Sequence, residues 1–218
     1  EESIYKATGS KPIGFRGPGY SFSDNTVSVL ADLGYMYDAT TLPTFIAPLA
    51  RAYLLKNSEI DREERKKRKS LFGKFSDGFR SNRPYVMQAG EKAVVQMPVT
   101  TMPLLKIPFH PSYILYLDLY SSFVAKTYFR LALYLCRLTK TEPSLLLHPL
   151  DFLGVEDVDD LSFFPAMKKS SSEKMEVMYW ILDELKTHFS LCTLNEHANE
   201  WQKLLLNRSD NLETIKIK

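Results

Sequence analysis

The sequence predicts an α/β fold in which short parallel strands alternate with amphipathic helices. The first observation is local: an apolar segment at 11–16 is followed by a turn, a helical pattern and a second short apolar segment at 35–38. The second is the recurrence of long helical patterns in the C-terminal half of the chain. The third is composition, because 218 residues with 44% hydrophobic and 25% charged residues suffice for one large domain or two small ones with a sizeable core.

The N-terminal part predicts a strand, a turn, a helix and a second strand. Residues 11–16 have the pattern of a buried strand. Ser23 is the expected N-cap of a helix that ends near Leu33, and Gly34 is the residue that stops it. Residues 35–38 form the second strand, which completes a βαβ unit. Because parallel strands of such units end at a common face, we expect ligand-binding groups at their carboxyl ends.

The segment at about 45–80 interrupts this alternation, and we expect it to be an inserted helical and basic segment. Residues 62–69 are strongly basic, with apolar residues on both sides. This pattern suits a helix that contacts a membrane surface, although a solvated helix is the simpler alternative. The net charge of only +2 and the absence of aromatic residues among the basic ones argue against a nucleic-acid partner.

The remaining elements follow from periodicity and from turn residues. Residues 85–88 and 93–97 alternate like the two strands of a hairpin, and four prolines between 98 and 111 predict an extended path. The elements expected after this path are a helix over 121–138, a strand over 144–147, an acidic loop over 151–164, a helix from 171 to about 187, a strand over 189–191, a helix over 194–206 and a frayed tail over 207–218.

The cysteines and the apolar stretches limit the class of protein. Cys136 and Cys192 lie among apolar neighbours, so we expect buried free thiols. The longest apolar region, 113–138, carries four charged residues, which is wrong for a membrane helix. No secretory signal is visible after Glu1. The compartment stays open between a bacterial cell envelope and the cytoplasm, and the oligomeric state also stays open.

Arg16 lies in the most informative turn of the chain, with three glycines and a proline in residues 14–20. Glycine admits left-handed backbone conformations and lets a ligand approach the main chain closely. The guanidinium stays charged near neutral pH and can orient a carboxylate, and a turn of this kind can aim an N–H group at negative charge. The alternative is a solvated arginine in a structural turn.

His148 ends the apolar run 145–147 and is the second candidate. The ordinary pKa of a histidine suits donation of a proton to a leaving group. Asp151 lies three residues later and could accept a hydrogen bond from the ring. The alternative is a structural histidine. His110 lies in the proline-rich loop and is a weaker candidate, while a structural role is expected for the C-terminal histidines, because no His or Cys spacing indicates a metal site.

These segments, in this order, resemble the metal-dependent polysaccharide deacetylases, the carbohydrate esterases with NodB homology. Residues 14–20 are similar to the arginine–proline segment of that family, and residues 33–40 to the passage from helix to strand that follows it. Residues 96–99 are similar to a strand that carries a proline, and residues 145–148 to the closing segment with its histidine. The resemblance covers about residues 10–197.

The resemblance implies a distorted (β/α) barrel that removes an acetyl group from the nitrogen of an amino sugar in a polysaccharide or glycan. It implies a divalent metal, with zinc as the first expectation, whose bound water attacks the amide. It implies that His148 protonates the leaving amine and that Arg16 orients the catalytic base. Backbone near Gly19 or Tyr20 would donate to the oxyanion. The implied substrate contacts are Pro18, Leu145, Leu147 and Asp151, with the two leucines around the acetyl methyl group.

The sequence also departs from the family pattern. The Asp-Asp pair and the His-Ser/Thr-x-x-His metal segment precede the arginine segment in the family, yet residues 1–15 contain no Asp or His. The Asp-x-x-Asp-Trp segment is absent as well. We therefore expect residues 1–206 to be the C-terminal part of such a barrel, with its first strands and its metal ligands absent from this chain.

Two alternatives stay open. One is a hydrolase of a small non-peptide C–N bond, and the other is a barrel without catalysis that binds or acts as a scaffold. The deacetylase interpretation also makes a geometric prediction, that Arg16 and His148 face one shared cleft.

Overall fold

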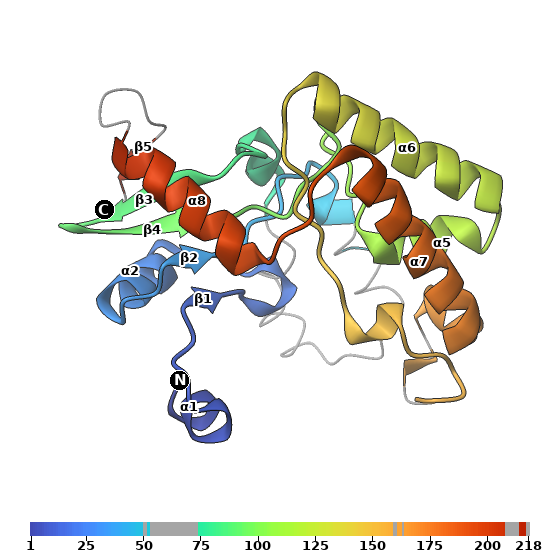
Figure 1. Ribbon diagram of the computed structural model, residues 1–218, viewed down its shortest axis with the longest axis horizontal. Helices are drawn as coiled ribbons and strands as arrows, with labels where there is room; N and C mark the ends of the chain where they lie inside the picture. The colour runs from blue at the N-terminus through green and yellow to red at the C-terminus, as the bar shows by residue number, and fades with distance from the viewer. Residues whose placement is uncertain (50–51, 53–73, 159–160, 163, 208–213, 217–218) are drawn as a thin grey trace. The chain divides into compact units, whose positions relative to one another are not determined.

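The computed structural model describes residues 1–49, 52, 74–158, 161–162, 164–207 and 214–216 (Figure 1). The chain divides into two compact units, one made of residues 1–99 and 192–218 and the other of residues 100–191. The sequence predicts one barrel part over 1–206 instead. Each unit is described below by itself. The predicted basic segment 62–69, and with it the predicted membrane-surface contact, lies outside the described residues.

The first unit is built on a mixed sheet with the strand order β1-β2-β4-β3-β5 (Figure 1). β1, β2 and β4 run parallel to one another, β3 is antiparallel to β4, and β5 is parallel to β3. The strands are β1 Gly14–Phe15, β2 Tyr37–Asp38, β3 Tyr85–Ala89, β4 Lys92–Gln96 and β5 Thr214–Lys216. The α/β class is thus confirmed.

The predicted βαβ unit is present. Helix α2 (Asp24–Asp32) begins at the N-cap Ser23, whose hydroxyl accepts a hydrogen bond from a backbone N–H in the first turn. It ends before Gly34, which has φ of +78°, a conformation that glycine adopts without strain. The strands on either side pair in parallel. The first strand is shorter than predicted because Pro12 has no N–H to donate and the glycine-rich turn follows at once.

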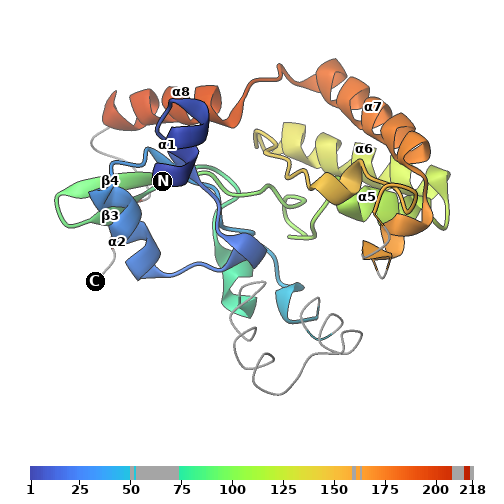
Figure 2. The ribbon, with the colours of Figure 1, turned by 90° about the horizontal axis from the view of Figure 1, so that it is seen from below.

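Two helices cover opposite faces of the sheet, α2 on one face and α8 (Leu194–Asn207) on the other (Figure 2). Adjacent residues of β4 explain this arrangement, because successive side chains of a strand point to opposite faces. Val94 belongs to the buried cluster on the α2 side, while Val95 belongs to the cluster that contains Ala198 of α8. The predicted hairpin of β3 and β4 and the predicted C-terminal helix are therefore both present.

The C-terminal end differs from the expected frayed tail. Thr214–Lys216 forms β5, which pairs with residues 86–88 of β3. The outer edge of β3 otherwise presents unpaired backbone N–H and C=O groups, and pairing with a returning strand satisfies them.

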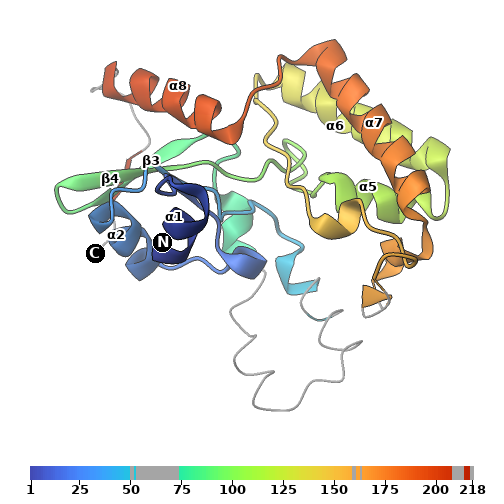
Figure 3. The ribbon, with the colours of Figure 1, turned by 60° about the horizontal axis from the view of Figure 1, so that its bottom comes forward.

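The second unit consists of helices that pack around an apolar core (Figure 3). The helices are α5 (Pro111–Asp118), α6 (Ser122–Leu138) and α7 (Ser171–His188), with the short turns η4 (Pro149–Asp151) and η6 (Pro165–Lys168) between the last two. The two long helices lie where the sequence predicts them, and their N-caps are Ser121 and Ser170. No helix in the described ranges is both long and apolar enough to cross a membrane.

Two predictions for this unit are wrong, and one helix was not predicted. Residues 144–147 and 189–191 are irregular rather than strands. Ser144 N donates to the hydroxyl of Thr100 at 2.7 Å, so a side chain takes the place of a strand partner. Phe189 is the C-cap of α7, and its N–H still bonds to the helix. Helix α5 was not predicted; Pro111, the last proline of the predicted extended path, occupies its first helical position, where proline needs no partner.

Candidate functional site

His148 lies directly before η4, and this turn brings Asp151 back onto it. The Asp151 carboxylate accepts a hydrogen bond from the backbone N–H of His148 at 2.7 Å, and Asp151 N donates to the His148 carbonyl at 2.9 Å. The carboxylate Oδ2 lies 3.7 Å from Nδ1 of the imidazole. The His148 side chain is 42% exposed and that of Asp151 only 2%. The turn therefore joins an accessible ring to a buried carboxylate.

Ser112, in the first turn of α5, links the two groups. Its hydroxyl donates to Asp151 Oδ1 at 2.6 Å, and its oxygen lies 3.0 Å from Nδ1 of His148. A hydroxyl has one proton to give and an ionised carboxylate can only accept, so Nδ1 of the ring must carry the proton that it shares with Ser112. No hydrogen bond from the described part of the chain reaches Nε2. Nε2 is therefore the nitrogen that remains for proton exchange.

Asp151 stays ionised although it is buried. Burial by itself would raise the pKa of this carboxyl, but hydrogen bonds from His148 and Ser112 and the charge on His148 hold the pKa below its ordinary value. The geometry thus suits a histidine that exchanges a proton through Nε2 with a group approaching from outside.

His110, the N-cap residue of α5, lies next to this cluster. Its ring centroid is 5.8 Å from that of His148 and 4.7 Å from that of Tyr113, and the residue is 3% exposed. Sequence reasoning ranked His110 as a weak candidate and did not single out Ser112. Both residues lie at the start of α5, a helix that the proline-rich sequence did not indicate. No local signal therefore related them to His148.

Leu145 and Leu147 precede His148 in an irregular segment. Leu145 packs against the core of the unit, whereas Leu147 is 48% exposed. The two leucines therefore have different surroundings, and the acetyl-methyl pocket that the resemblance implies stays a prediction.

Arg16 directly follows β1 at the carboxyl end of the parallel strands, in the first unit. Its Nε donates to the carbonyl of Ala39 at 3.0 Å, and Gly17 N donates to the Thr40 hydroxyl at 2.7 Å. Burial lowers the pKa of the guanidinium, while the charges of nearby groups, Asp38 among them, act in the opposite direction. The arginine is therefore tied to the end of the neighbouring strand rather than solvated.

Asp38 and Gln96, the last residues of β2 and β4, lie at the same edge and are fully buried. The Asp38 carboxyl accepts hydrogen bonds from the Thr40 N–H at 3.0 Å, from the Thr40 hydroxyl and from Gln96 Nε2 at 2.8 Å. Burial nevertheless dominates and raises the pKa of Asp38. Sequence reasoning missed both residues, although their places at strand ends were the available signal.

The turn after Arg16 has a constrained backbone. A Cβ added at Gly17 would lie 2.8 Å from the carbonyl oxygen of Ser21, so this position requires glycine. Gly19 and Tyr20 have φ of +60° and +57°. For a tyrosine this left-handed conformation costs about 1–3 kcal/mol. Pro18, at the first position of this turn, is exposed. The oxyanion role implied for the Gly19 and Tyr20 backbone stays a prediction.

Arg16 and His148 belong to different compact units. The expectation that they face one cleft concerns the placement of one unit against the other, and it stays a prediction.

The divalent metal that the resemblance implies stays a prediction, with its ligands expected outside this chain. Within the described residues, no group of three or more His, Cys, Asp or Glu side chains could hold a metal ion. Burial raises the pKa of the Cys136 thiol to about 12, so this thiol stays protonated at neutral pH. Cys136 is buried as predicted, whereas Cys192 is exposed.

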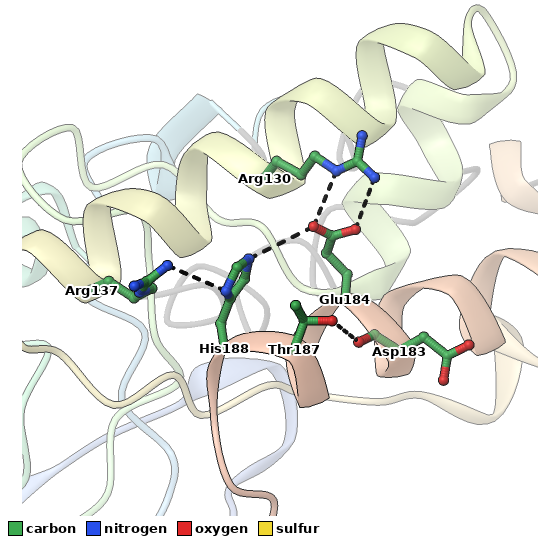
Figure 4. A network of polar contacts seen from close by, with 6 residues as sticks. All are labelled: Arg130, Arg137, Asp183, Glu184, Thr187 and His188. Carbon is green, nitrogen blue, oxygen red and sulfur yellow. Dashed lines mark hydrogen bonds and ion pairs between the residues drawn. The ribbon is translucent and has the colours of Figure 1, made fainter.

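The C-terminal histidines have structural partners, as expected. His188 Nδ1 lies 3.3 Å from the Arg137 guanidinium, and Nε2 lies 3.9 Å from Glu184 (Figure 4). Glu184 also accepts two hydrogen bonds from Arg130, so these four residues join α6 to α7. His197 accepts a hydrogen bond from an indole N–H of α8.

Comparisons with known proteins leave this chain without a match. No family model, no curated protein and no solved structure matches it. The resemblance to polysaccharide deacetylases therefore rests on the ordered motifs quoted above.

Proposed function

We propose that the intact protein hydrolyses an amide C–N bond, with N-acetylated amino sugars of a glycan or polysaccharide as the substrate class, on a distorted (β/α) barrel of the NodB type. The single observation that carries this proposal is His148, whose Nδ1 is held by Ser112 and whose Nε2 is open, beside the buried carboxylate of Asp151. The ordered motifs support the substrate class.

The proposed role of His148 follows from the chemistry of amides. Addition of water to the amide carbonyl gives a tetrahedral intermediate, which must expel nitrogen as it collapses. An amide nitrogen leaves poorly as an anion, so a proton must reach it as the C–N bond breaks. Nε2 of His148 gives that proton, and Asp151 stabilises the charged ring beforehand. The products are a carboxylic acid and an amine.

Further parts of the proposal concern residues and groups around this step. Arg16 orients the base that accepts the proton of water, and backbone near Gly19 or Tyr20 donates to the oxyanion. A divalent metal belongs to the intact protein, with ligands outside the described residues. Leu147 is exposed and Arg16 is partly buried, which is compatible with these roles.

The first testable prediction is the loss of acetate release in His148→Gln. The intact protein is assayed on chitin-like and peptidoglycan-like oligomers and on small acetamides. We expect acetate from the oligomers and a loss of about 100-fold or more in kcat for His148→Gln, because the leaving amine is no longer protonated. Metal content, measured in parallel, should not change.

His197→Gln is the matched control, since His197 lies in α8 and has a structural partner within that helix. It should keep its rate. Release from the small acetamides alone would favour the small C–N substrate, and glycan binding without any release would favour the scaffold. Full activity in His148→Gln would rule out the proton-donor role.

A further inference from the structure

Lys174 is a lysine that no water reaches. It lies in the first half of α7 and is 0% exposed. Its Nζ lies 2.9 Å from the carbonyl of Leu150, 2.5 Å from that of Leu153 and 3.2 Å from Met167 Sδ. An ammonium has three protons, and here each has an acceptor. Lysine is almost never fully buried unless it is paired, and none of these three acceptors is a carboxylate.

The two backbone carbonyls show which segment of the chain the ammonium binds. Leu150 is the central residue of η4, and Leu153 follows Asp151 by two positions. The two contacts therefore fix the main chain on both sides of Asp151. This is the stretch that brings the carboxylate onto the His148 N–H and the Ser112 hydroxyl.

Burial and the surrounding charges act on Lys174 in opposite directions. Burial lowers the pKa of the Lys174 ammonium, while the charges of Asp151, Glu156 and Asp157 act in the opposite direction. A buried ion that only fills space is often replaced by an apolar residue without loss of stability. A lysine with two of its three donors directed at the backbone of one turn serves the geometry of that turn.

We propose that Lys174 is a positioning residue for His148, an inference that rests on the proposed function. The ammonium anchors the carbonyls of Leu150 and Leu153, which sets Asp151 against Ser112. Ser112 in turn fixes the imidazole through Nδ1, so that Nε2 meets the substrate in one orientation.

The first part of the experiment measures turnover in the intact protein. Lys174→Met keeps the length and the apolar stem of the side chain and removes its three donors. We expect kcat for acetate release to fall about 10- to 100-fold with KM changed less than about twofold, because small displacements of a catalytic group have effects of this size. Lys169→Met is the matched control, since Lys169 makes an ion pair of 2.7 Å with Asp118 in the same unit. It should lose some stability and keep kcat.

The second part of the experiment observes the imidazole N–H signals by NMR and does not require catalytic activity. The chain has four histidines, so selective ¹⁵N labelling gives few imidazole signals, and His148→Gln assigns the one of interest. We expect the Nδ1–H signal of His148 to be slow to exchange in the unsubstituted protein and in Lys169→Met, and to be lost in Lys174→Met. Should Lys174→Met fail to fold, Lys174→Leu tests the same loss, because leucine also has no donor.

The two parts separate the two proposals. Loss of the signal together with loss of kcat supports the positioning role. Loss of the signal in a protein that releases no acetate from any substrate supports the positioning role and refutes the proposed function. An unchanged Nδ1–H signal in the Lys174 variants overturns the positioning role, whatever the activity.

Discussion

The pKa values of two buried aspartates are shifted in opposite directions, downward for Asp151 and upward for Asp38. Asp151 accepts from a hydroxyl and a backbone N–H beside a histidine, and its pKa is lowered despite burial. Asp38 also accepts several hydrogen bonds and lies near Arg16, yet burial outweighs them and its pKa is raised.

The second prediction concerns the pH dependence of stability through Asp38. A carboxyl whose folded pKa is raised stabilises the fold below its unfolded pKa, and this contribution is lost as the pH rises through the folded pKa. Asp38→Asn removes the ionisation, and the Gln96 amide can turn to keep one hydrogen bond with the new side chain. We expect Asp38→Asn to be more stable than the unsubstituted protein near neutral pH.

Urea unfolding between about pH 4 and pH 8 measures this difference. The advantage of Asp38→Asn should grow with pH and vanish in acid. Asp32→Asn is the control, because Asp32 is exposed and forms a surface ion pair with Lys92. An advantage of Asp38→Asn that stays constant across the pH range would contradict the raised pKa.

At the scale of elements, helices with local start and stop signals were predictable. α2, α6 and α7 each begin at a serine whose side chain caps the first turn, and the hairpin of β3 and β4 follows from alternation. α5 was missed because proline usually interrupts a helix, and its first residue is a proline. The prediction of strands at 144–147 and 189–191 was wrong because apolar runs of this length can also pack as irregular segments.

The third prediction concerns the edge of the sheet. Ending the chain at residue 207 removes β5 and leaves the outer edge of β3 unpaired. Amides of β3 that face this edge should then exchange with solvent faster, and the protein should self-associate at high concentration. Hydrogen exchange and analytical ultracentrifugation measure the two effects.

Removal of residues 217–218 alone keeps β5 and provides the control. If β3 exchanges at the same rate after truncation at 207, the pairing of β5 does not protect this edge.

At the scale of the whole molecule, the candidate groups are divided between two compact units. The cluster at the carboxyl edge of the sheet, with Arg16, belongs to the first unit, and the cluster around His148 belongs to the second. The proposed function requires both to act on one substrate, and a double-mutant cycle tests this requirement without any assumption about the placement of the units.

The fourth prediction is therefore a coupling between Arg16 and His148. Arg16→Met and His148→Gln are measured singly and together in the intact protein, with kcat/KM for acetate release as the readout. Residues that serve one transition state show losses that do not add, so the double variant should be little worse than His148→Gln alone. Arg130→Met, which breaks a surface contact with Glu184, should combine additively with His148→Gln. Fully additive losses for Arg16 would place it outside the reaction.

The sequence by itself determined the α/β class, the capped helices, the hairpin and the two residues, Arg16 and His148, around which the clusters are built. These features depend on residues close together in the chain, whose periodicity and turn chemistry are visible without coordinates. Only the tertiary structure decided that Ser112 and Lys174 meet the turn after His148, and that Asp38 and Gln96 gather at one strand edge. Such contacts join distant segments, and burial by those segments, rather than the residue type, sets the charge of each group.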